Sequence, residues 1–173
     1  MKFILIFIFC MNIFLPTVFS KDFGGVRVEN QPCIAGIVLN EKFSARKIRQ
    51  LFGEGKVYKT ETTSRGNEKI WWSYKGATVV TVKNRIKLVA VMRKYSENHI
   101  LLQTKEGIGI GEKSDKVLKC YGLPTYIQLK NQSGLDTTSY MYNQIGKLSF
   151  FSILDATNNV INIGFMSSDW YSL

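Results

Sequence analysis

Few residues in this chain could perform acid–base or nucleophilic chemistry, and none stands in a catalytic motif. His99 is the only histidine among 173 residues, and it lies in a polar stretch where we expect a solvated side chain. The sequence has no Gly-x-Ser-x-Gly nucleophile elbow and no His-Glu-x-x-His zinc motif. A carboxylate pair for glycoside hydrolysis has no local signature. No local motif therefore indicates an enzyme, and a hydrolase that uses such a carboxylate pair stays as an alternative.

The glycines at 107, 109 and 111 lead into Lys113-Ser114 and partly match a phosphate-binding loop. Such a loop needs a glycine directly before its Lys-Ser pair, because its backbone N–H groups surround the phosphates. Glu112 occupies that position. One histidine and scattered carboxylates also give no metal-ligand pattern. The sequence therefore predicts no catalytic residues, no cofactor and no metal.

The first 20 residues have the pattern of a secretory signal peptide. Lys2 precedes an apolar run, Phe3 to Leu15, of about 13 residues, shorter than the roughly 20 that a spanning helix needs. Val18 and Ser20 fit the small-residue positions of a cleavage site. We expect cleavage after Ser20, no stable membrane anchor, and a monomer that is periplasmic or secreted.

Two cysteines, Cys33 and Cys120, follow this segment. In an oxidising compartment an even number of cysteines suggests a disulfide framework. We expect one disulfide between them. The alternative is that Cys120 is simply a small buried core residue, because it lies on the apolar side of a predicted helix.

The chain is strongly basic, with 23 Lys and Arg against 13 Asp and Glu and a formal net charge of +10. Such a charge favours anionic partners. Export argues against nucleic acid and leaves acidic lipid, cell-wall polymer or an acidic protein of the envelope or secreted fraction. The alternative is that the positive charge only keeps a secreted protein soluble. Arg46, Lys47 and Arg49 are candidate binding residues on one predicted helix, although the solvated face of any amphipathic helix has the same pattern.

Aromatic residues supply the second set of candidate binding residues. Trp71 and Trp72 are consecutive in a predicted strand, so their side chains must point to opposite faces of the sheet. An exposed tryptophan flanked by tyrosines would suit a protein partner, or stacking on sugar rings. The alternative is that another segment covers it. The full set is Trp71, Trp72, Tyr74, Tyr140 and Tyr142.

The chain has the same order of elements twice. Ser44 and Ser114 are each placed as the N-cap of a short amphipathic helix, and Gly53 and Gly122 end these helices. Runs rich in β-branched and aromatic residues follow each helix and predict antiparallel strands. The predicted fold is α+β, with two tandem modules, each a short helix packed on a three- to four-stranded antiparallel sheet.

The predicted boundaries follow from this repeat. Residues 1–20 are the signal peptide, 21–35 a lead-in, 36–93 the first module, 94–106 a connector and 107–173 the second module.

The second module carries a resemblance to a known family. Its glycines, capped helix and Gly-x-Pro ending resemble the BamE-like (SmpA/OmlA) envelope module, and two such modules in tandem resemble the β-lactamase inhibitor proteins. The matching positions are Gly107, Gly111, Ser114, Val117, Gly122 and Pro124. In the first copy, Asn40 and Gly55 replace Gly111 and Pro124.

The resemblance implies an exported protein that is not an enzyme and binds another protein through a sheet face. It supplies no contact residues. The alternative is a cell-wall-directed carbohydrate binder or hydrolase that uses the aromatic residues.

Overall fold

The computed structural model describes residues 33–92, 102–132, 135–144 and 147–168. The predicted signal peptide, most of the lead-in, and His99 lie outside these ranges. The first half contains β1 (Cys33–Ile34), β2 (Ile37–Val38), α1 (Ala45–Phe52), β3 (Lys56–Thr62), β4 (Glu68–Tyr74), β5 (Ala77–Val82) and β6 (Arg85–Met92). The second contains α2 (Ser114–Tyr121), β7 (Tyr126–Gln132), β8 (Leu135–Gln144), β9 (Lys147–Leu154) and β10 (Asn159–Ser167).

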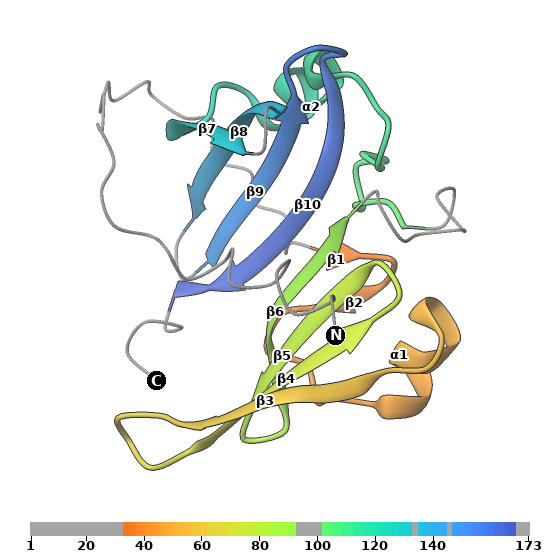
Figure 1. Cartoon of the computed structure of the whole chain (residues 1–173), viewed down its shortest axis with the longest axis vertical. Coiled ribbons are helices and arrows are strands. Elements are labelled where there is room, and N and C mark those ends of the chain that lie inside the picture. Colours follow the sequence, from red (N-terminus) through yellow and green to blue (C-terminus); the bar gives the residue numbers. More distant parts are fainter. Residues whose placement is uncertain (1–32, 93–101, 133–134, 145–146, 169–173) are drawn as a thin grey trace.

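Eight of these strands form one continuous antiparallel sheet in the order β3-β4-β5-β6-β10-β9-β8-β7. The halves meet where β6 pairs with β10 (Figure 1), and there Val89 lies opposite Phe165. The short strands β1 and β2 pair with each other in a separate two-stranded sheet. Because β6 and β10 are rich in apolar residues, pairing them removes two edges that would otherwise expose such residues and unpaired backbone groups.

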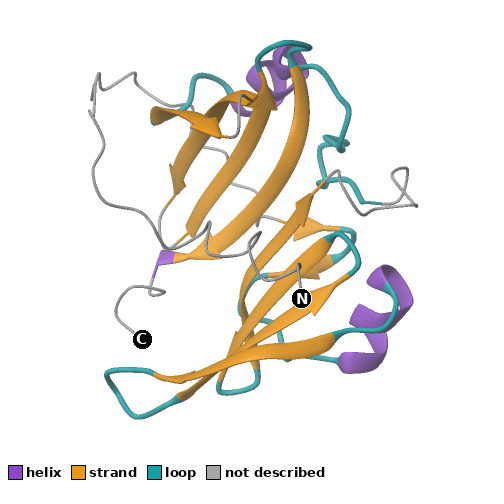
Figure 2. Ribbon diagram, in the orientation of Figure 1, coloured by secondary structure: helices purple, strands orange, loops and turns teal. Residues whose placement is uncertain are grey.

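The prediction of two tandem α+β modules is therefore wrong. The described chain is mostly β, with a single eight-stranded sheet, a small two-stranded sheet and two short helices (Figure 2). One row of paired residues crosses the junction between the halves on one face of the sheet. This row contains Trp72, Val79, Val89 and Phe165.

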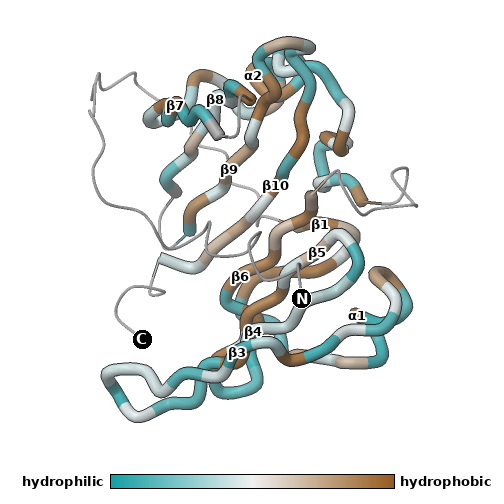
Figure 3. Tube along the Cα trace, in the orientation of Figure 1, coloured by the Kyte–Doolittle hydropathy of each residue, from teal (hydrophilic) through white to brown (hydrophobic). Residues whose placement is uncertain are grey.

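Both helices pack against this same face, which we call the helix-bearing face. Ile48 and Phe52 of α1 join Val117 and Tyr121 of α2 in one hydrophobic cluster that includes residues of both halves of the sheet. Apolar residues concentrate in the central strands β5 and β6, whereas hydrophilic residues dominate β3 at the edge (Figure 3). The core is therefore shared by the two halves.

The local sequence explains where the helices begin and end. Ser44 caps α1 by accepting a hydrogen bond from the Lys47 backbone N–H at 3.3 Å, which confirms that prediction. The matching prediction for α2 is wrong, because Lys113 is its N-cap residue and the Ser114 hydroxyl donates instead to Asn158 Oδ1 at 2.6 Å. Gly122 ends α2 with a φ of 73°, which favours glycine.

The helices of the described residues are too short and too polar to cross a membrane.

Candidate functional site

The two adjacent tryptophans of β4 lie on opposite faces of the sheet. Trp72 is on the helix-bearing face, where its ring stacks on Phe43 with 4.9 Å between ring centroids and 23° between ring planes. Trp71 is on the other face, where its indole N–H donates to Glu61 Oε2 at 3.0 Å. Strand alternation therefore separates the two indoles into different surroundings.

Trp71 is held by charged neighbours and is only 6% exposed. The ammonium groups of Lys69 and Lys59 lie 5.4 and 6.0 Å from its ring centroid, within the range of cation–π attraction. The hydrogen bond from Lys59 lowers the pKa of Glu61. Burial raises this pKa, whereas the hydrogen bond from the Trp71 N–H lowers it further. Burial lowers the pKa of Lys69, while the Glu61 charge opposes this. This arrangement leaves little of the Trp71 ring for a partner.

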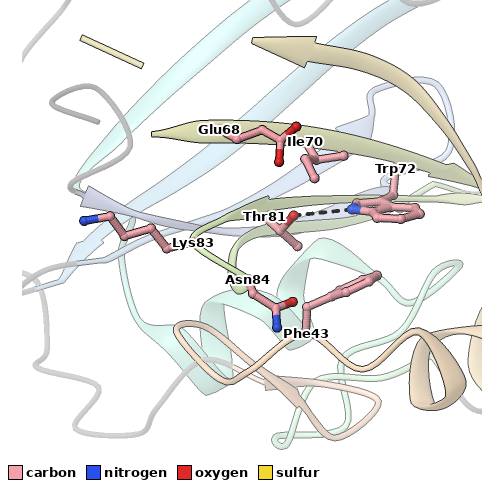
Figure 4. A pocket seen from close by; sticks show the side chains of 7 residues that line it. All are labelled: Phe43, Glu68, Ile70, Trp72, Thr81, Lys83 and Asn84. Carbon is pink, nitrogen blue, oxygen red and sulfur yellow. Dashed lines mark hydrogen bonds between the residues drawn. The ribbon is translucent and has the colours of Figure 1, made fainter. Parts of the chain in front are cut away.

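Trp72 lines a shallow groove of about 170 Å³ between β4, the β5–β6 turn and the segment before α1 (Figure 4). Its indole N–H donates to Thr81 Oγ1 at 3.3 Å. The groove is lined by Phe43, Glu68, Ile70, Trp72, Thr81, Lys83 and Asn84.

Local backbone geometry forms one wall of this groove. Lys83 and Asn84 both have positive φ, 50° and 57°, as in the tight turns that suit β-hairpins. The Asn84 carbonyl accepts a hydrogen bond from the Phe43 backbone N–H at 2.8 Å, which places Phe43 beside the turn. The groove thus combines an aromatic wall with carboxylate, ammonium and amide groups, a set suited to a ring that carries polar substituents.

The remaining aromatic candidates belong largely to the core. Tyr142 is 5% exposed, and its ring centroid lies 5.5 Å from the ring centroid of Tyr121. Its hydroxyl donates a hydrogen bond to the Gly122 carbonyl at 3.0 Å. Burial raises the pKa of Tyr142 well above its usual range. Tyr74 and Tyr140 are half-buried against the same hydrophobic cluster. The structure therefore does not bring the five aromatic candidates together on one open surface.

The basic candidates of α1 also differ in their surroundings. Lys47 donates to Glu41 Oε1 at 2.9 Å and to the Gly36 carbonyl at 2.7 Å, and so ties the helix to the β1–β2 hairpin. Arg49 pairs with Glu54 at 3.2 Å on an exposed surface, where such a pair contributes little to stability. Arg46 is exposed. Of the three, Lys47 has a structural role.

The two cysteines are free thiols in this structure, and both are half-buried. The predicted disulfide is thus not formed in it. Within the described ranges, no group of three or more His, Cys, Asp or Glu side chains could hold a metal ion.

An apolar patch at the edge strand β7 was not among the predicted binding residues. Ile127 and Leu129 are 52% and 75% exposed, and Leu123, just before the strand, is 54% exposed. Ile127 lies opposite Tyr140, and Leu129 lies two residues further along the strand, so the side chains of Ile127 and Leu129 continue the helix-bearing face to the border of the sheet. We call Leu123, Ile127 and Leu129 the β7 edge patch. Their apolar alternation was visible in the sequence, but their exposure depends on β7 being the last strand.

No family model and no curated protein matches this chain. Solved structures that are similar to it include the following two. One is a cysteine-rich secretory protein from Staphylococcus aureus subsp. aureus Mu50, with 11% identity and a TM-score of 0.44 over 76% of this chain and 45% of that one. The other is an extracellular protein containing an SCP domain from Bacillus anthracis str. Ames, with 12% identity and a TM-score of 0.45 over 91% of this chain and 51% of that one.

The chain thus spans about half the length of these two solved proteins. The resemblance to tandem BamE-like modules, and to the inhibitor proteins built in that way, is wrong, because one continuous sheet with a shared core replaces the expected repeat.

Proposed function

We propose that this chain is an exported protein that is not an enzyme and that binds a protein partner at the β7 edge patch. The observation that carries the proposal is the exposure of Ile127 and Leu129 on a terminal strand, with Leu123 exposed just before it. Single exposed aliphatic residues are normal, but neighbouring ones on one edge are typical of an interaction site.

The size of the patch is consistent with this role. Full burial of one large aliphatic side chain contributes about 1.5 to 3 kcal/mol. Since these three side chains are between half and three-quarters exposed, covering all three would contribute about 3 to 5 kcal/mol. A micromolar complex requires about 8 kcal/mol. Further contacts beside the patch must therefore supply the remainder.

The contacts of several described carboxylates support binding over catalysis. The carboxylates of Glu41, Glu61 and Glu112 each contact a lysine, and Asp136 accepts from the Asn131 amide. A glycoside hydrolase instead needs two carboxyl groups facing one cleft. The formal net charge of +10 favours a partner with acidic character.

Export rests on the signal-peptide pattern of residues 1–20. N-terminal sequencing of the protein recovered outside the cytoplasm should begin at Lys21. A protein that keeps Met1 and stays in the cytoplasm would overturn the exported part of the proposal.

The binding test is affinity capture from envelope and secreted fractions. The baits are the wild-type protein, Leu129→Lys and, as a matched control on the opposite sheet edge, Val57→Lys, since Val57 is 46% exposed on β3. We expect one stoichiometric protein with the wild type and the control, and its loss with Leu129→Lys. Equal capture by all three baits, or none by any, would refute a partner site at this edge.

A second candidate function is carbohydrate binding in the Trp72 groove. The aromatic wall with Glu68 and Asn84 at its border favours it, because sugar rings stack on aromatic faces and present hydroxyls to polar groups. The test is retention on purified cell wall, with Glu68→Ala as the variant. Retention that is lost in Glu68→Ala and kept in Leu129→Lys would favour this function.

A further inference from the structure

We infer that the partner presents an extended, acidic segment that pairs along the outer side of β7 as a ninth strand of the sheet. This inference rests on the proposed function and adds the mode of binding and the chemistry of the partner. It depends on the contrast between the two edges of the sheet.

The edge formed by β3 is protected against further pairing. It carries Lys56, Lys59 and Glu61, and a bulge interrupts its register between Val57 and Lys59. Charged residues and bulges are the usual means by which proteins block an open sheet edge.

The edge formed by β7 is less protected, because it has no bulge and few charges. Its seven residues pair with β8 in an unbroken register from Tyr126 to Gln132. Lys130 is its only charged residue, and it contains no proline. Among the described strands, none lies beyond β7 in the sheet. Backbone groups on the outer side of a terminal strand are a template for one more strand.

The dimensions of β7 define the length of the added segment. Seven residues at about 3.4 Å each make a strand of roughly 24 Å. An antiparallel neighbour would place alternate side chains on the helix-bearing face, beside Ile127 and Leu129. We therefore expect a partner segment of about seven residues with aliphatic side chains at every second position.

Charge selects an acidic segment over a second copy of this chain. Two β7 strands paired about Leu129 would bring their Lys130 residues diagonally together. They would also join two chains that are each strongly basic. A segment with glutamate or aspartate at the intervening positions would instead be attracted to the basic chain.

The test uses a synthetic nine-residue peptide in which valine alternates with glutamate or threonine. The control is the same peptide with N-methyl groups on its three central residues, which removes backbone donors and keeps the side chains. Binding is measured by fluorescence anisotropy, and amide hydrogen exchange locates it on the protein.

We expect the unmodified peptide to bind at least tenfold more tightly than the methylated one and to slow amide exchange in β7. Leu129→Lys should weaken binding at least tenfold, and Val57→Lys should leave it within twofold. Equal affinity for the two peptides, or protection confined to the Trp72 groove, would overturn strand addition. Analytical ultracentrifugation gives a further test. A wild-type dimer that the Leu129→Lys substitution dissociates would also overturn the inference, because a second copy would then occupy the β7 edge.

The outcomes separate this inference from the proposed function. If capture of the partner from cells depends on Leu129 but the protein binds both peptides equally, the added strand is refuted. Protein binding at the β7 edge would still be supported. Absence of any capture that depends on Leu129 would refute the proposed function itself, whatever the peptides do.

Discussion

Replacing Phe165 with alanine should destabilise the whole chain, because its ring lies in the core that the two halves of the sheet share. Phe165 is fully buried in β10, opposite Val89 of β6 on one side and Ser149 of β9 on the other. Truncating a buried phenylalanine to alanine costs about 3 to 5 kcal/mol. Since domains are stable by only about 5 to 15 kcal/mol, this loss is a large fraction of the total.

The expected size of the effect can be stated as a melting temperature. For a domain of this length each kcal/mol lowers Tm by about 2 to 4 °C, so Phe165→Ala should lower it by about 6 to 20 °C. Far-ultraviolet circular dichroism and calorimetry should both detect one transition, because the two halves share a core. The control is Leu129→Ala, at a side chain that is 75% exposed, which should change the stability by less than about 0.5 kcal/mol.

Two separate transitions in Phe165→Ala, with only one half melting early, would refute a shared core. A loss below about 1 kcal/mol would show that the core does not depend on this ring.

Three further predictions concern stability. Gly164→Ala would place its Cβ 2.0 Å from Cζ of the Phe150 ring, so we expect a loss of about 1 to 3 kcal/mol in urea unfolding. Asn158→Ala should cost about 2 kcal/mol, because it removes the acceptor for Ser114 and leaves alanine at a φ of 56°; Asn158→Gly, which tolerates that φ, should cost less. Burial raises the pKa of Tyr74 to about 12, so between pH 10 and 12 the unfolded state releases a proton that the native state keeps, and stability should fall as the pH rises. Tyr74→Phe should reduce that fall, and identical pH profiles for the two proteins would contradict the assignment.

Local features of the fold could be predicted from the sequence because they depend on near neighbours in the chain. Ser44 caps α1, and Gly53 and Gly122 end the two helices. The strands after each helix also match the β-branched and aromatic runs. These signals act over a few residues, where propensity and capping dominate.

The pairing of β6 with β10 could not be predicted in this way. Their apolar residues show that both strands are buried. The same run of apolar residues would be found in a strand buried inside a small separate sheet and in a strand that joins two halves of a larger sheet. The sequence was therefore compatible with two modules, and the register that joins Val89 to Phe165 decided against them.

The candidate site illustrates the same limit. Alternation correctly separates Trp71 from Trp72, but their partners Glu61 and Phe43 are ten and 29 residues away in the chain. The exposure of Leu129 depends on which strand is last in the sheet, a property of topology that no local pattern contains.

The most direct test of the central claim is site-specific photo-crosslinking in cells that produce the protein. A benzophenone amino acid is placed at Leu129, on the β7 edge, or at Val57, on the β3 edge. The account predicts one dominant crosslinked protein outside the cytoplasm from position 129 and none of it from position 57. The same products from both positions, or no product from either, would contradict a partner site at the β7 edge.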